Sequence, residues 1–246
     1  QAGWGICEND FPREKIVSPY PFKTAKEHYE ALVAEVEAKG GPTKHTRETL
    51  PEWDGRYQYT GTLFQNGQSI DGRTQWNYMH AVQVPTVLSL LTEEYQTRFV
   101  QQTFHHAVTN AHQWPASYCW PEGFMRYFHW PALFQMDLMM TPELVQWLGG
   151  TADNFLRHAL VGREFIDQDV SPRIGDDVPR WYGETVGFWD ENAFITWTSN
   201  IQGWTFHSGF ETSNKLQVIE IYTERTNDAG EFVGLLHEAI FYDPEA

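Results

Sequence analysis

The feature that most constrains the fold is the even spacing of short apolar segments and turns from about residue 131 onward. "ALFQMDLMMTPELVQWLGG" predicts two strands around Thr141-Pro142, and "FLRHALVGREF" predicts another. "TVGFWDENAFITWTSN" predicts a hairpin that turns at 190–192, and "LQVIEIYTERTNDAGEFVGLLHEAIFYD" predicts a second that turns at 227–230. This spacing predicts a closed or half-closed antiparallel β-barrel.

The residues before the barrel are predicted to form two helices and a short strand. Thr24 can cap a helix in "TAKEHYEALVAEVEAKGG", and Thr92 precedes a second helical segment, "EEYQTRFVQQTFHHAVTN". The first segment carries one apolar face, made of Tyr29, Leu32, Val33 and Val36. The second carries an apolar stripe of Tyr95, Phe99, Val100 and Phe104. "LPEWDGRYQYTGTLF" predicts a turn and a short strand.

We therefore expect an α+β, mainly β fold. One domain would span residues 1–246: an N-terminal arm (1–22), a helical part with a short strand (23–114) and a β-barrel (115–246).

Charge and hydropathy exclude several classes of partner. The net charge of −16 argues against nucleic acids and anionic membrane surfaces, which both recruit clustered Lys and Arg. No apolar run approaches the ~20 residues that a membrane-spanning helix needs. Aromatic residues make up 15% of the chain, with eleven Trp and eleven Tyr. They either fill a barrel interior or line a pocket for a sugar or an aromatic ligand.

Three segments concentrate side chains suited to acid/base chemistry. "CWPEGFMRYFHW" gathers Arg126, Tyr127 and His129 among aromatic residues, where histidine can act as a base and arginine can stabilise developing negative charge. Alternatively, Arg126 forms a structural ion pair with a carboxylate and closes the bottom of the barrel. "IQGWTFHSGFETSN" places His207 in an aromatic loop, which is either a lid or a simple cover.

"RWYGETVGFW" places Tyr182 and Glu184 on one side of an alternating strand and Trp181 on the other. If that side faces the barrel lumen, apolar surroundings would raise the pKa of the Glu184 carboxyl and suit it to general acid catalysis. If it faces outward, Glu184 is an ordinary surface carboxylate.

Metal and cofactor motifs are not found in the sequence. His105 and His112 are two helical turns apart, about 10.5 Å of rise, too far to share one metal on a straight helix. The sequence has no zinc-type spacing, P-loop or dinucleotide fingerprint. We expect neither a metal nor a cofactor. Cys7 and Cys119 are either an inter-element disulfide or two unrelated thiols.

Residues from about 115 to 246 resemble a large group of secreted bacterial proteins without assigned activity. The group's pattern includes a Cys followed by Pro-x-Gly-x-x-Arg, a Thr-Pro strand, an Arg-rich strand, a Gly-x-Ser-x-Gly-x-Trp-Glu-Gly-Asp-x-Leu-Val-Val-x-Thr stretch and a Ser-x-x-Leu-x-x-x-Glu strand. The matching residues here are Cys119, Pro121, Gly123, Arg126, Thr141, Pro142, Arg157, Arg163, Gly183, Gly187, Trp189, Phe194, Thr198, Ser213, Leu216 and Glu220. The chain departs from the pattern at 190–192, where Asp-Glu-Asn replaces Glu-Gly-Asp, and at Trp197, which replaces an acidic residue.

This resemblance implies a lipocalin-like barrel and export to the periplasm or beyond, with a signal peptide already removed. Export favours the Cys7–Cys119 disulfide. The resemblance implies no particular reaction.

The first hypothesis is a secreted, cofactor-independent enzyme that performs elimination, isomerisation or hydrolysis on a small aromatic, terpenoid or glycosidic substrate. His129 or His207 would be the base and Glu184 the acid, while Tyr182 and Arg126 would stabilise negative charge. The expected substrate-binding residues are Trp181, Trp189, Trp197, Trp204 and Tyr127.

Two other hypotheses are a lipocalin-type binding protein without turnover and an assembly protein with an aromatic interface. A carboxylate and a histidine within hydrogen-bond reach in the lumen favour the enzyme. An apolar lumen favours the binding protein, and a filled barrel beside an exposed apolar patch favours assembly, including a homo-oligomer.

Overall fold

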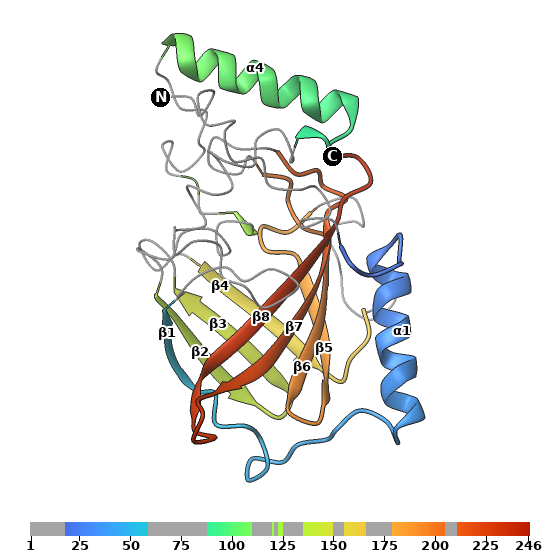
Figure 1. The fold of residues 1–246 in the computed structure, drawn as a ribbon, viewed down its shortest axis with the longest axis vertical. Coiled ribbons are helices and arrows are strands. Elements are labelled where there is room, and N and C mark those ends of the chain that lie inside the picture. Colours follow the sequence, from blue (N-terminus) through green and yellow to red (C-terminus); the bar gives the residue numbers. More distant parts are fainter. Residues whose placement is uncertain are drawn as a thin grey trace.

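The computed structural model describes residues 18–58, 88–109, 120, 123–124, 135–149, 155–165, 179–204 and 211–246. Within these residues the chain forms an eight-stranded, nearly closed barrel-like sheet accompanied by two helices (Figure 1). The predicted α+β, mainly β fold class is therefore confirmed.

The strands follow one another in the sheet in chain order. They are β1 (Gly55–Gln58), β2 (Gln135–Thr141), β3 (Leu144–Gly149), β4 (Phe155–Val161), β5 (Glu184–Asp190), β6 (Ala193–Ser199), β7 (Gln217–Thr226) and β8 (Phe232–Tyr242). Six of the neighbouring pairs are antiparallel, and β4 pairs with β5 in parallel. That parallel pair departs from the fully antiparallel barrel expected from the sequence. Within the described residues, β8 is hydrogen bonded to β7 alone and forms an edge of the sheet.

Both predicted hairpins are confirmed. Each is stabilised by the residues of its own turn. Glu191 takes a positive φ of 52° in the turn between β5 and β6. In the turn between β7 and β8, the Asn227 side chain accepts the backbone N–H groups of Ala229 and Glu231. Gly230 supplies the positive φ of 79° that this turn requires.

Helix α1 (Ala25–Ala38) covers the outer face of the sheet over β6 and β7 (Figure 1). The Thr24 side chain accepts the backbone N–H of Glu27 at 3.1 Å, as a helix N-cap does. Val36 packs against Phe188 and Ile195, which point outward from β5 and β6. The helix thus buries apolar side chains on the outside of the barrel.

Helix α4 (Glu93–Thr109) lies beyond one end of the barrel (Figure 1). Arg98 forms an ion pair with Glu211 at 3.2 Å, and the Thr92 hydroxyl donates to the Glu245 carbonyl at 2.8 Å. Tyr95 and Phe99 of the predicted stripe are buried, whereas Val100 and Phe104 are exposed. No helix in the described ranges has the length and apolarity needed to cross a membrane.

Large aromatic side chains fill much of the barrel interior. The main core cluster contains Trp53, Leu138, Met140, Val145, Trp147, Phe155, Ala159, Trp189, Phe194 and Tyr222. Their rings contact one another, as between Trp147 and Tyr222 with centroids 5.6 Å apart. Within the described residues, many of the aromatic side chains therefore serve to pack the core.

Candidate functional site

A polar network crosses this aromatic interior. Arg157 on β4 points inward, because strand alternation buries it while Leu156 and His158 on either side are exposed. Its guanidinium Nη1 donates to Glu220 Oε1 at 3.0 Å, and Nη2 contacts Glu220 Oε2. Both side chains are almost fully buried, at 1% exposure for Arg157 and 0% for Glu220. They form a two-point ion pair inside the barrel.

The protein surrounds the Arg157 guanidinium on several sides. Its Nη2 donates to the Thr198 hydroxyl oxygen at 3.0 Å, and that hydroxyl is hydrogen bonded to Thr185 at 2.9 Å. The guanidinium carbon lies 4.7 Å from the Trp147 ring centroid and 4.8 Å from that of Phe124. Rings at this distance attract a cation. Arg157 is therefore held as a buried cation.

The Glu220 carboxylate accepts two further hydrogen bonds. The Tyr222 hydroxyl donates to its Oε1 at 2.7 Å, and His237 Nε2 lies 2.9 Å from the same oxygen. Burial alone would raise the pKa of Glu220. The charge of Arg157 and the hydrogen bonds from His237 and Arg157 oppose this and hold the pKa well below its usual range. Glu220 is therefore an anion inside the barrel.

His237 is the member of this network that reaches solvent. It lies on the edge strand β8 opposite Tyr222, and its side chain is 23% exposed. Its ring stacks on the Tyr222 ring with centroids 4.4 Å apart and planes at 4°. Because ionised Glu220 can only accept, His237 donates through Nε2, which puts the lone pair of the neutral ring on Nδ1. This arrangement can hold and move a proton at the barrel wall.

Glu184, the predicted acid, lies on the outer face of the sheet. Thr185 beside it points inward to Thr198, so Glu184 shares the opposite face with Phe188, which packs under α1. Its carboxylate forms an ion pair with Arg180 at 3.2 Å. Of the two orientations left open by the sequence, the structure has the outward one.

Tyr182 does not share that face. Gly183 has a φ of 69°, which interrupts the strand alternation just before β5 begins. The Tyr182 ring packs against Phe155 with centroids 4.6 Å apart, on the core side. The expectation that Tyr182 and Glu184 act on one surface is therefore wrong.

The four predicted substrate-binding tryptophans lie in three places. Trp189 is in the core against Trp53, with ring centroids 5.1 Å apart. Trp197 is on the outer face, with its ring centroid 5.5 Å from that of Tyr29 on α1. Trp181 and Trp204 contact each other edge-on, with centroids 5.2 Å apart. These side chains do not line one shared pocket.

The other predicted site residues lie outside the described residues. They are Arg126, Tyr127, His129, His207, Cys7 and Cys119. Their roles, and the disulfide, stay predictions. Within the described ranges no group of three or more His, Cys, Asp or Glu side chains is arranged to hold a metal ion.

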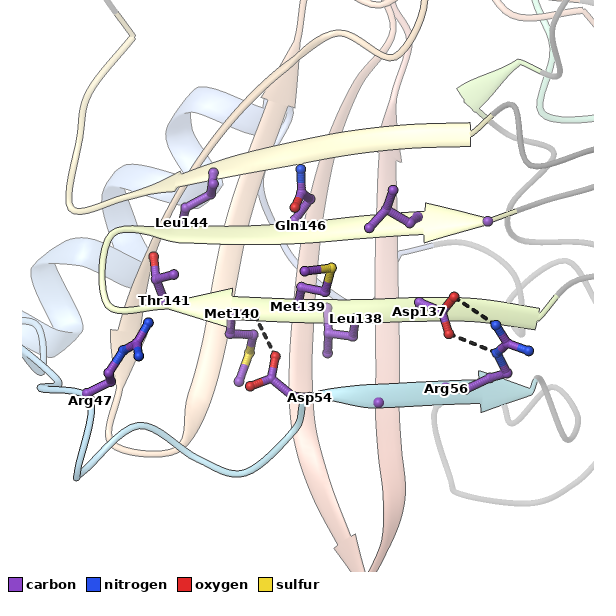
Figure 2. Close-up of a pocket in the computed structure, with 13 residues that line it drawn as sticks. Arg47, Asp54, Arg56, Asp137, Leu138, Met139, Met140, Thr141, Leu144 and Gln146 are labelled. Atoms are coloured by element: carbon purple, nitrogen blue, oxygen red, sulfur yellow. Dashed lines mark hydrogen bonds and ion pairs between the residues drawn. The ribbon is translucent and has the colours of Figure 1, made fainter.

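A shallow, open groove of about 810 Å³ lies on the outer face of β1–β3 (Figure 2). Arg56 and Asp137 form a two-point ion pair at one end, with nitrogen–oxygen distances of 2.8 and 3.1 Å. Arg47 lies near Thr141 at the other end (Figure 2). The groove is separate from the His237–Glu220 network, which lies on the inner face.

No family model, curated protein or solved structure matches the chain.

Arg157 and Glu220 belong to the C-terminal sequence pattern, but the pattern predicts no role for them, and it does not include His237 or Tyr222. The available signal was Glu220 in the apolar run "VIEIY", where a buried position predicts a partnered carboxylate.

Proposed function

We propose that the protein is an enzyme that performs acid/base chemistry on a small organic substrate, with His237 as the residue that transfers the proton. One observation carries the proposal: a partly exposed histidine lies 2.9 Å from a fully buried, ionised carboxylate. A histidine and a carboxylate in this relation form the pair that many general bases use.

Glu220 would act as a positioning residue. Its carboxylate fixes the orientation and the tautomer of the His237 ring, and it stabilises the imidazolium that forms when Nδ1 accepts a proton. Arg157 holds Glu220 ionised and is too deeply buried to meet a substrate. Tyr222 supports the same arrangement through its hydrogen bond to Glu220 and its stacking on His237.

The substrate class follows from where His237 is exposed. Aromatic side chains pack the described interior, so a substrate would approach His237 at the β8 edge of the sheet. The partly exposed imidazole beside the Tyr222 ring suits a small aromatic or otherwise flat molecule that loses a proton in elimination or isomerisation. Besides elimination and isomerisation, His237 could activate a water molecule for hydrolysis.

The proposal moves the acid/base role away from Glu184, whose carboxylate is paired with Arg180 outside the barrel. His129 and His207 remain further candidates for a second acid/base group.

Chemical modification by diethyl pyrocarbonate, read by peptide mass spectrometry, tests the proposal. The reagent modifies neutral, accessible imidazoles, and a working base must be both. Exposed His105 is the positive reference and fully buried His28 the negative one. We expect His237 to react at pH 7 and to be protected by any compound that is turned over. Reaction as slow as that of His28 would exclude His237 as the base.

Export to the periplasm or beyond is also part of the proposal and is supported by the C-terminal resemblance. An exported chain is expected to carry the Cys7–Cys119 disulfide. Alkylation of the unfolded protein with and without prior reduction tests this. Two added alkyl groups without reduction would argue against the disulfide.

A further inference from the structure

We propose that two copies of this chain associate face to face through the outer surface of β1–β4. This surface, the sheet face below, is distinct from the His237 network, and the proposal does not depend on the enzymatic one. Its apolar side chains are Met139, Leu144, Leu148, Leu156 and Leu160.

The sheet face combines these apolar side chains with a central polar pair, Gln146 and His158, and two of its apolar side chains are exposed. Met139 is 52% exposed and Leu156 is 46% exposed. On the other side of the barrel, the outward apolar residues Phe188 and Ile195 are covered by α1. A contiguous apolar area on a protein surface usually marks a contact with a partner.

The strand register arranges these residues in three rows across the strands. Leu148 and Leu156 pair in one outer row, and Leu144 and Leu160 pair in the other. The middle row contains Met139, Gln146 and His158. The last two are hydrogen bonded to each other at 2.6 Å. The two outer rows are therefore chemically alike, with leucine at the same two strands.

This likeness makes the sheet face self-complementary. Consider a two-fold axis that lies in the contact plane and runs along the middle row. It places Leu144 against the partner's Leu148, and Leu160 against the partner's Leu156. Along the axis, Met139, Gln146 and His158 each meet the same residue of the partner. Such an interface uses the same patch on both copies, as most homodimers do.

The charges on the rim fit the same rotation. Asp137 lies in the row of Leu148, whereas Arg47 lies beside Thr141 in the row of Leu144 (Figure 2). The axis therefore brings each Arg47 to the partner's Asp137. Arg47 makes no ion pair with the described residues of its own chain. Asp137 remains 42% exposed beside Arg56 and can accept a second cation.

Charge balance favours this face over the rest of the protein surface as the contact between two copies. The protein carries a net charge of −16, which opposes contact between two copies over most of the surface. Across the groove Arg47 and Arg56 offset Asp54 and Asp137. This face can therefore meet a copy of itself without the general repulsion.

The size of the sheet face predicts a weak dimer. Four strands about 4.8 Å apart and three rows about 6.8 Å apart, with their side chains, give about 400 Å² on each copy. The total of about 800 Å² is below the ~1,200 Å² of stable specific interfaces and fits a weak, transient contact, so we expect a dissociation constant of ~100 μM.

Sedimentation velocity from ~5 to ~500 μM protein at ~0.15 M salt tests the proposal. We expect a monomer–dimer equilibrium that Leu156→Lys weakens at least tenfold. Val108→Lys on α4 is the matched control, because Val108 is 67% exposed and lies away from the sheet face. It should leave the equilibrium unchanged. A monomer throughout, or a dimer that Leu156→Lys leaves intact, would overturn the proposal.

A charge exchange gives a second readout that does not depend on the leucines. Arg47→Asp and Asp137→Arg should each weaken the dimer, the second also because it breaks the Arg56–Asp137 pair. The double variant should bind more tightly than either single variant, because the two charges then meet in reverse. Failure of the double variant to recover would contradict the proposed axis.

Discussion

Arg157 on β4 reaches Glu220 on β7 through the barrel interior, although β5 and β6 separate the two strands in the sheet. The ion pair thus connects opposite parts of one sheet across its inner face. The same Glu220 carboxylate holds His237 on β8. The pair therefore links the packing of the barrel to the residue that we propose as its base.

Removal of one partner of this pair should destabilise the barrel strongly. Glu220→Gln or Arg157→Met leaves a buried charge without its counterion, which costs about 3–5 kcal/mol. The double variant should lose less than the sum of the two. Urea denaturation measures these free energies of unfolding. As a control, Arg56→Met breaks the exposed Arg56–Asp137 pair and should cost less than about 1 kcal/mol. Equal losses at the two pairs would contradict the buried role of Arg157.

Gly183→Ala should destabilise the protein by about 3 kcal/mol. A Cβ at Gly183 would lie 2.6 Å from the Ser199 carbonyl oxygen, and the residue has a φ of 69°. Both the contact and the backbone conformation oppose a side chain. Gly230→Ala separates the two causes, since its φ is 79° and no atom lies within 4 Å. Its cost should be about 1 kcal/mol, from the backbone alone. Thermal unfolding of the two variants would show whether Gly183→Ala loses more.

His28 should make the protein less stable as the pH falls from about 6.5 to about 4. Burial lowers the pKa of His28 to about 4, so in this interval the unfolded chain binds a proton that the folded chain does not. Its Nδ1 is hydrogen bonded to Tyr242, and its ring packs against Phe22 and Tyr20. Glu27 lies near Tyr242, and Glu238 accepts a hydrogen bond from the Tyr20 hydroxyl. The full loss is up to about 3 kcal/mol.

The variant His28→Phe should abolish this pH dependence, which urea denaturation at several pH values would measure. His45→Gln, at an exposed histidine, should retain it. A slope that persists in His28→Phe would assign the acid sensitivity to other groups.

Local signals in the sequence predicted much of the fold. The turn residues at 227–230 and the Thr24 cap act within a few residues of chain, so both hairpins and α1 could be placed. The parallel pairing of β4 with β5 could not be predicted. The segment between the two strands carries no local signal that sets the direction of β5 relative to β4. Composition also could not show whether Trp189 fills the core or lines a pocket.

The candidate site was harder to predict because its contacts are long-range. Arg157 and Glu220 are 63 positions apart, and only the register of the whole sheet places both on the inner face. The orientation of Glu184 depended on Gly183, whose positive φ is one of several conformations that glycine adopts equally well. Alternation alone therefore led to the wrong relation between Tyr182 and Glu184.

The most direct test of the central claim compares His237→Gln with Glu184→Gln in deuterium exchange. Small aryl ketones and cyclic enones in D₂O would be followed by proton NMR, starting from any compound that protects His237 from modification. We predict that His237→Gln slows enzymatic exchange at least ~100-fold, the usual contribution of a general base. Glu184→Gln should stay within about twofold, because Glu184 is paired with Arg180 on the outer face and lies away from His237. Full activity in His237→Gln, or loss confined to Glu184→Gln, would contradict the account.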